Sequence, residues 1–379
     1  MLGISMNATK PLLKCAACQA ESPADALFCQ RCTAPLAVAG LQEFDAEDFQ
    51  LCQRALLEVL AETAGVTPAP TADEELWRAY LSAFWLRPET ALILYAEALA
   101  LRAIGTPDSV PWLDLGCGDG VHAALCAGWR FKADFDVFQS LDLASRDIYN
   151  AWDPTAFSCS TVTRGRRIEF GVDIKPTAVS RAAALGVFGR VFCGDATALD
   201  LEDGSVGVIY SNMLRDLGAP LGAALNQCRR VLRDDGVLLL SAMTPDYSRN
   251  LYFAPTARKA EASGRTKQAQ RLLRLDRGRS VFCQRQLSVP QWQELLEGCG
   301  LTLEEARPIV GSRVIRFWDV GLRPFSLPLL RQRGLWLNAG ILATVKDSLL
   351  GAMAQLLAPL AGGILDGEPC MHLLVVRKK

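Results

Sequence analysis

Apolar residues recur at helical spacing in the first part of the chain. Between residues 44 and 64 they predict a helix with one apolar face. That face would carry Phe49, Leu56, Leu57 and Leu60. The stretch 71–74 matches a capping box and should open a second helix. A third helix is expected over 88–102, since the Gly-Thr-Pro stretch at 105–107 would stop it. Together these helices would form a connector over residues 41–106.

From residue 111 the pattern changes to short apolar runs that alternate with helical segments. Helical patterns follow the first run, at 121–128, and precede the fifth, at 223–232. Strands that alternate with helices are typical of an α/β fold with a parallel sheet. The predicted strands lie at 111–115, 168–173, 191–196, 206–211, 237–242 and 369–378, with one more after Gly300.

Three segments are longer than this alternation requires, and we predict insertions near 131–167, 244–286 and 321–366. The first of them separates Asp114 from Asp173 by 59 residues, although a strand–helix–strand step needs far fewer. It is rich in aromatic and acidic residues. Inserted loops of this kind either shape a substrate pocket or decorate the surface, and both interpretations stay open here.

The second insertion contains a basic run at 258–285, in which Arg271, Arg274, Arg277 and Arg279 are closely spaced. Such a run could bind phosphate on RNA, on a phosphorylated small molecule or on a lipid headgroup. It could equally be a solvated helix face. Few aromatic residues stand between the charges, so a base-stacking surface is not indicated.

The third insertion contains an apolar stretch at 334–365 whose only charges are Lys346 and Asp347. That charge pair, Pro359 and the glycines at 362–363 argue against a membrane span. The stretch could be a core or lid helix, a pocket for an apolar substrate, or a helix on a membrane surface. The helical stripe consists of Leu342, Val345, Leu349, Met353, Leu356, Leu360 and Ile364.

Composition narrows the choice of partners. The 379 residues include 40 Lys and Arg against 41 Asp and Glu, which gives a net charge of −1. A protein that neutralises many phosphates usually has a basic excess, so a nucleic-acid partner is disfavoured. Most of the 13 cysteines show no pairing pattern, and no apolar leader precedes the first of them. We therefore expect a cytoplasmic protein, with a peripheral membrane contact as an option.

Four of these cysteines form two CxxC pairs near the start of the chain, at Cys15 and Cys18 and at Cys29 and Cys32. Four thiolates complete a tetrahedral zinc site and leave no open position for water, so the zinc would be structural. Redox dithiols are the alternative interpretation. The stretch resembles a zinc ribbon over residues 1–40. Its loop contains no Lys or Arg, which favours a structural staple or a protein-docking surface over nucleic-acid binding.

A glycine-rich turn directly follows the first predicted strand of the α/β region. The run 113–120 reads Leu-Asp-Leu-Gly-Cys-Gly-Asp-Gly and places Gly116, Gly118 and Gly120 between a strand and a helix. Backbone N–H groups and a helix N-terminus approach a ligand closely in that arrangement. The pattern is GxGxG and not the GxGxxG of dinucleotide-binding proteins.

This run resembles the first motif of class I S-adenosylmethionine (SAM) methyltransferases. Later segments resemble further motifs of the family in the same order: GVDIKP at 171–176, VFCGDA at 191–196 and RRVLRDDGVLLLSA at 229–242. The resemblance covers roughly 108–245, 287–318 and the last ten residues. It implies a Rossmann-like domain over 107–379 with a seven-stranded, mostly parallel sheet.

The resemblance also implies which residues hold SAM. Asp173 would bind the ribose hydroxyls, with Asp142 as a rival for that role. The full set is Asp114, Gly116, Gly118, Gly120, Asp173, Asp195 and Ala196 near the adenine, and Asn212 beside the methyl group. No catalytic base stands out. Asp216 and Tyr210 are weak candidates, and His122 and His372 are expected to be structural.

The leading hypothesis is a SAM-dependent methyltransferase that acts on a small-molecule or lipid-like acceptor. Members that act on quinones often carry His where this chain has Arg215, so their chemistry is not transferred. One alternative is an RNA methyltransferase that uses the zinc ribbon and the basic run. Another is a catalytically silent SAM-binding protein that docks on a partner through the ribbon.

Overall fold

The structure is a computed structural model. It describes residues 12–15, 20–23, 29, 44–63, 69–105, 109–138, 161–214, 221–276, 279–282, 285–322 and 325–379. Its centre is a seven-stranded sheet in the order β10-β11-β9-β8-β3-β6-β7. The strands are β3 (Trp112–Leu115), β6 (Ile168–Asp173), β7 (Phe188–Cys193), β8 (Val206–Ser211), β9 (Leu232–Met243), β10 (Leu301–Gly311) and β11 (Pro369–Lys378).

The pairing of these strands confirms the predicted α/β fold with a mostly parallel sheet. β3 pairs in parallel with β6 and with β8, β6 with β7, and β8 with β9. β11 alone runs antiparallel to its neighbours β9 and β10. The chain runs outward from β3 to β6 and β7 and then returns to place β8 on the other side of β3. Ligands of open α/β sheets bind at such a switch point, beyond the carboxyl ends of the strands.

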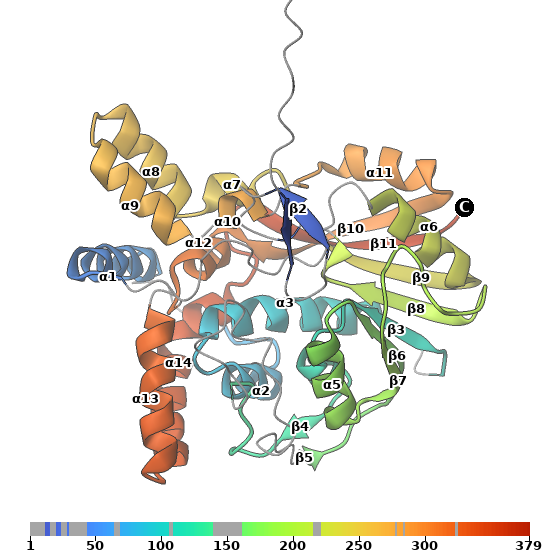
Figure 1. The fold of residues 1–379 in the computed structure, drawn as a ribbon, viewed down its shortest axis with the longest axis horizontal. Coiled ribbons are helices and arrows are strands. Elements are labelled where there is room, and N and C mark those ends of the chain that lie inside the picture. Colours follow the sequence, from blue (N-terminus) through green and yellow to red (C-terminus); the bar gives the residue numbers. More distant parts are fainter. Residues whose placement is uncertain are drawn as a thin grey trace, which may run out of the picture.

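Helices cover both faces of the sheet (Figure 1). α3 (Pro88–Ile104), α4 (Val121–Cys126) and α5 (Pro176–Leu185) lie on one face, and α6 (Leu221–Val231) and α11 (Val289–Gly298) on the other. Side chains alternate between the two faces because successive Cβ atoms of a strand point to opposite sides. Trp112 and Tyr210 therefore belong to the core under α3, whereas Leu113 and Ile209 belong to the core under α6.

The three predicted connector helices exist, but the first buries a different face from the one expected. In α1 (Ala46–Ala61) the buried positions are Asp48, Leu51, Cys52, Ala55 and Val59, and Leu57 is 60% exposed. The face is rotated because α1 packs on α12 (Ser312–Val320) and binds the basic helix α9 (Thr266–Asp276) through its acidic first turn. The cap of α2 (Glu74–Ala83) also differs, since the side chain of Asp73, not Thr71, accepts the N–H of Leu76.

Three arginines of the basic run make internal contacts. The insertion folds into α7 (Tyr247–Asn250), α8 (Phe253–Ala262), α9 and α10 (Arg279–Phe282). Arg271 pairs with Asp45, Glu47 and Asp48 of α1, and Arg274 also pairs with Asp48. Arg279 is 5% exposed and donates to the carbonyl of Trp318, and Arg277 lies outside the described residues. Arg271, Arg274 and Arg279 thus serve the fold instead of forming an open phosphate-binding face.

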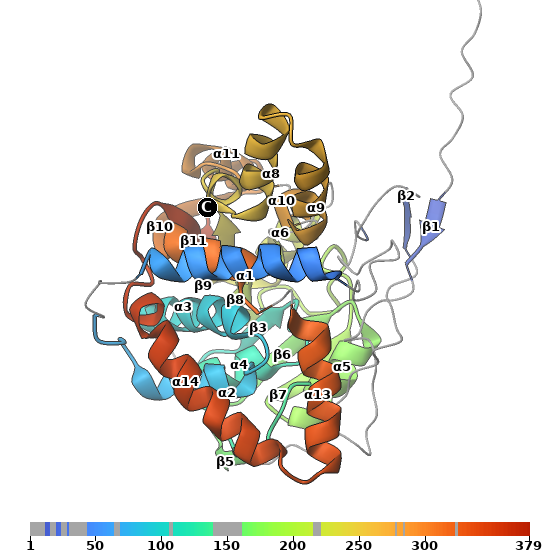
Figure 2. The same cartoon turned by 90° about the vertical axis from the view of Figure 1, so that its left-hand side faces the viewer.

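The third insertion forms a helical hairpin of α13 (Ser326–Asn338) and α14 (Leu342–Gly362), which stands beside the domain (Figure 2). Lys346, expected as one of two charges that interrupt an apolar helix, is 3% exposed. Its ammonium group donates to the carbonyls of Ala133 and Phe135 at 2.9 and 2.7 Å. Arg333 of α13 pairs with the buried Asp136. Among the described helices, none has the length and apolarity needed to cross a bilayer.

Two short sheets complete the fold. β4 (Arg130–Phe131) pairs with β5 (Thr161–Thr163) at the two ends of the first insertion, whose residues 139–160 lie outside the described part. β1 (Leu12–Lys14) and β2 (Glu21–Pro23) form an antiparallel hairpin in the segment predicted to be a zinc ribbon.

Candidate functional site

The predicted cofactor residues gather at the carboxyl ends of four adjacent strands. Gly116 to Gly120 follow β3, Asp173 ends β6, Asp195 and Ala196 follow β7, and Asn212 follows β8. Neighbouring strands lie about 4.8 Å apart, so the four ends form one continuous edge. The rival acid Asp142 and the candidate base Asp216 lie outside the described residues.

The glycine loop adopts a conformation that requires glycine. Gly116, Gly118 and Gly120 have φ angles of 84°, 56° and 79°, in the left-handed region that other residues rarely enter. A Cβ on Gly118 would meet no atom within 4 Å, so the loop faces open space there. At Gly116 a Cβ would lie 2.7 Å from the Cβ of Met213, so this glycine allows β3 to approach the segment after β8.

Asp173 holds the glycine loop in place, and its carboxylate oxygens can still accept further hydrogen bonds. Its Oδ2 accepts the N–H of Gly118 at 2.9 Å, and its Oδ1 accepts the N–H of Lys175 at 2.8 Å. Each carboxylate oxygen has two lone pairs, so one acceptor position on each oxygen is not used by these two bonds. The side chain is half-buried at the strand end. Two adjacent acceptors in this position match the two hydroxyls of a ribose.

Asp195 and Asn212 are also half-buried and lie on either side of the β6 and β3 ends. The Oδ1 of Asp195 accepts the N–H of Thr197 at 2.9 Å, which shapes the turn after β7. The side chain of Asn212 donates to Oε2 of Glu97 at 3.3 Å. The open position at Gly118, the acceptors of Asp173 and the polar groups at the flanking strand ends form a site that fits SAM.

The sequence analysis missed a buried polar network directly beneath this edge. Glu97 of α3 has no exposed surface. Besides Asn212, its carboxyl group binds the hydroxyls of Tyr210 at 3.0 Å and Ser241 at 2.6 Å. α3 is apolar on nearly every side, and Glu97 is the one acidic residue in its middle. An acid within such an apolar helix is the sequence pattern that could have predicted a buried carboxyl group.

The network continues through His122, which lies between two tyrosines. Its Nε2 is 3.1 Å from the Tyr210 hydroxyl and its Nδ1 is 2.9 Å from the Tyr80 hydroxyl. Because Tyr210 donates to Glu97, its oxygen accepts from Nε2–H, and Tyr80 then donates to Nδ1. Cys126 adds a thiol 3.3 Å from the Tyr80 oxygen. These bonds link α2, α3, α4 and β8 into one unit.

This environment changes the acid–base properties of two predicted site residues. Burial, the neighbouring Glu97 and other negative groups raise the pKa of Tyr210 well above 10, so its phenol stays protonated at neutral pH. A role as catalytic base is therefore disfavoured. Burial, with smaller contributions from Asp173 and Glu97, raises the pKa of Asp114 to about 8. Asp114 lies on the α3 face of the sheet, like Trp112 two residues earlier in β3.

At the N-terminus the structure describes two of the four predicted zinc ligands. Cys15 and Cys29 are 1% and 2% exposed, and Cys18 and Cys32 lie outside the described residues. The N–H of Cys15 donates to the carbonyl of Ala20 at 2.8 Å, which closes the turn after β1. No cluster of three or more metal-binding side chains occurs within the described part, which lacks half of this ligand set.

Comparison with known proteins finds that part of this domain is similar to methyltransferases. Residues 155–240 match a family model described as a methyltransferase domain. The match runs from the first insertion into β9 and leaves out the glycine loop, which that insertion separates from the rest. Malonyl-[acyl-carrier protein] O-methyltransferase 1 of Coxiella burnetii is 34% identical over 85 residues, which are 22% of this chain and 28% of that protein. The chain thus spans less than a third of the length of this relative.

Two solved structures that are similar to this chain have low sequence identities and low TM-scores. A possible histamine N-methyltransferase from Thermotoga maritima is 18% identical, with a TM-score of 0.33, over 59% of this chain and 75% of that one. A TehB-like SAM-dependent methyltransferase from Corynebacterium glutamicum is 16% identical, with a TM-score of 0.35, over 88% and 99%. Residues 155–240 of this chain are thus similar to a methyltransferase domain.

Proposed function

We propose that this protein transfers a methyl group from SAM to a small-molecule or lipid-like acceptor. The observation that carries the proposal is the bond from Gly118 N–H to Asp173, which places a glycine loop and a half-buried acid side by side at the switch point. Gly116, Gly118 and Gly120 would cradle the cofactor, Asp173 its ribose, Asp195 and Ala196 its adenine, and Asn212 its reactive end. Bound SAM supplies an electrophilic methyl group on a sulfonium.

The chain's own part in such a reaction is alignment and exclusion of water. Proximity and orientation can supply much of the rate of a bimolecular transfer. Glu97 fixes the side chain of Asn212 from below, and the buried network holds α3 against β8 and β9. An acceptor that arrives ionised needs no base, whereas a protonated one would need a group such as Asp216.

The first acceptor to test is an acyl group on a carrier protein. The Coxiella burnetii relative is named for methylation of malonyl-[acyl-carrier protein]. A malonyl carboxylate is already ionised at neutral pH, so its methylation would require alignment only. Exposed Leu335, Leu337, Ile341 and Leu356 on the α13–α14 hairpin are compatible with a lipid-like acceptor and with a peripheral membrane contact.

The test is transfer of labelled methyl from SAM, first to malonyl-[acyl-carrier protein] and then to fractions of a cell extract. Label should enter a small-molecule or acyl-carrier fraction with the native protein and not with Asp173→Ala. Label in RNA would support the RNA alternative instead. SAM binding with no transfer to any fraction would support the silent-partner alternative. Cofactor binding measured by calorimetry separates the last case from a protein that does not bind SAM.

We also propose that Cys15, Cys18, Cys29 and Cys32 hold one structural zinc ion. The burial of Cys15 and Cys29 and the closed turn after β1 support a compact cysteine site. Elemental analysis should give one zinc per chain, and a variant with Cys29→Ser and Cys32→Ser should lose it. We expect that variant to retain methyl transfer. This result would mean that the ribbon serves for docking or anchoring and not for catalysis.

A further inference from the structure

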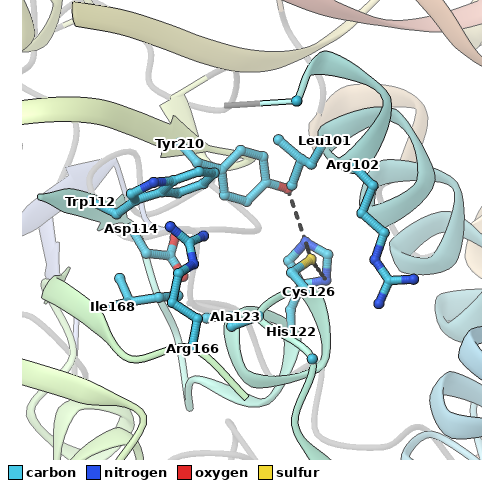
Figure 3. A pocket seen from close by; sticks show the side chains of 13 residues that line it. Leu101, Arg102, Trp112, Asp114, His122, Ala123, Cys126, Arg166, Ile168 and Tyr210 are labelled. Atoms are coloured by element: carbon cyan, nitrogen blue, oxygen red, sulfur yellow. Dashed lines mark hydrogen bonds between the residues drawn. The ribbon is translucent and has the colours of Figure 1, made fainter. Parts of the chain in front are cut away.

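A cavity of about 410 Å³ lies on the α3 face of the sheet (Figure 3). Its walls come from the end of α3, from α4 and the turn after it, and from the first residues of β3 and β6. They include Leu101, Trp112, Ala127, Arg166 and Ile168. A volume of this size suits a small organic ligand.

The cavity extends along the sheet from the first residues of β3 and β6 to Asp114, the third residue of β3, and Tyr210, the fifth residue of β8. Trp112 begins β3, four residues before Gly116, and Ile168 begins β6, five residues before Asp173. At about 3.3 Å per residue these separations amount to roughly 13 and 16 Å. Of the predicted cofactor residues only Asp114 lines the cavity, and none of the three loop glycines does.

The wall combines aromatic surface with one polar group that lacks a partner. Trp112 lies beneath the Arg166 guanidinium, 4.0 Å from the ring centroid, and Tyr210 forms a second aromatic wall. The polar wall groups His122, Cys126 and Tyr210 bond to one another and to Tyr80 and Glu97. Asp114 is different, because its carboxyl group makes no hydrogen bond to the described residues, although the residue is only 6% exposed.

We propose that this cavity is a second binding site, for a small planar aromatic molecule whose N–H or O–H group donates to Asp114. A buried carboxyl group without a partner loses hydration that a donor from the ligand would restore. The high pKa of Asp114, about 8, reflects the same loss and favours an uncharged donor at neutral pH. The aromatic and aliphatic walls would enclose the ring of the ligand.

The probe is indole, a planar ring with one N–H, and its matched control is 1-methylindole, which lacks the donor. We expect indole to bind the full-length protein in calorimetry with a dissociation constant on the order of 0.1–1 mM. 1-Methylindole should bind at least about five-fold more weakly. Asp114→Leu should remove this preference. S-Adenosylhomocysteine at saturation should not displace indole, since the two sites differ.

Ala127→Leu fills the cavity and should abolish indole binding, while the melting temperature and S-adenosylhomocysteine affinity stay unchanged. If that variant does not fold, Ile168→Phe serves the same purpose from the opposite wall. Displacement of indole by S-adenosylhomocysteine would overturn the proposal, because the cavity would then belong to the cofactor cleft. Equal binding of the two probes, undiminished binding to a folded filled variant, or no binding would also overturn it. None of these results bears on methyl transfer.

Discussion

Tyr210 of β8 donates its phenolic hydrogen to Glu97 of α3 across 3.0 Å, 113 residues apart in sequence. The same carboxyl group also accepts hydrogen bonds from the hydroxyl of Ser241 in β9 and from the side-chain amide of Asn212 after β8. One fully buried acid therefore joins the helix to two strands directly below the proposed methyl-transfer position. Fixing α3 and orienting Asn212 are the two roles that follow from this arrangement.

Glu97→Gln should destabilise the protein, because an amide nitrogen cannot accept a hydrogen bond and one donor loses its partner. The expected cost is roughly 1–3 kcal/mol, which corresponds to a fall in melting temperature of several degrees. Thermal unfolding followed by circular dichroism measures it. Glu294→Gln on the exposed side of α11 is the matched control and should melt like the native protein. Equal melting of both variants would contradict a structural role for Glu97.

Asp173→Ala should weaken SAM binding by at least about ten-fold. This factor corresponds to a loss of about 1.4 kcal/mol of binding free energy. The variant loses the ribose acceptors and also the bond that holds Gly118. Calorimetric titration with SAM gives the affinity. Asp200→Ala, an exposed acid near the same edge, is the control and should bind normally. Native-like affinity in Asp173→Ala would point to Asp142 as the ribose acid.

Asp114 should make the stability of the cofactor-free protein fall as the pH rises from about 4 to about 8. Its pKa in the folded protein, about 8, lies above the ordinary value of 3.8 for an aspartic acid side chain, so only the unfolded chain releases this proton within the window. Each unit of pKa difference corresponds to about 1.4 kcal/mol. Asp114→Asn cannot ionise, so its stability relative to the native protein should rise through the window and then level off. Parallel pH profiles of the two proteins in urea unfolding would refute this.

The ion pairs between α1 and α9 should stabilise the fold more than surface pairs do. Asp48 is buried and binds both Arg271 and Arg274, and it also completes the cap of α1. We expect Asp48→Asn to cost roughly 1–3 kcal/mol. A double-mutant cycle with Arg274→Gln should show coupling. The exposed pair Arg190–Asp200 should give about 0–0.5 kcal/mol in the same experiment.

The positions of the strands along the chain and the glycine loop could be predicted because both depend on local sequence. Alternating apolar runs located the strands of the central sheet, and the glycines at 116, 118 and 120 adopt the left-handed conformation that a tight turn requires. The predicted carboxyl-end residues come together since parallel strands bring their ends to one edge.

The contacts that the sequence could not predict join distant segments. The buried face of α1 depends on α12 and α9, and Arg271 and Arg274 of the basic run bind acidic residues more than 200 residues earlier. Glu97 and Lys346 look like ordinary polar interruptions of apolar helices until their partners are known. Local periodicity contains no information about such partners, so it could not predict these contacts.

The buried pair of Asp136 and Arg333 also has a consequence for the order of folding. Its members are 197 residues apart, and Lys346 reaches back 213 residues to Ala133. Contacts with such large sequence separation carry a high loop-closure cost and are expected to form after the folding barrier. Arg333→Met should therefore accelerate unfolding while leaving the refolding rate nearly unchanged, which stopped-flow kinetics can measure. The α13–α14 hairpin would then be the first part to detach when the protein begins to unfold.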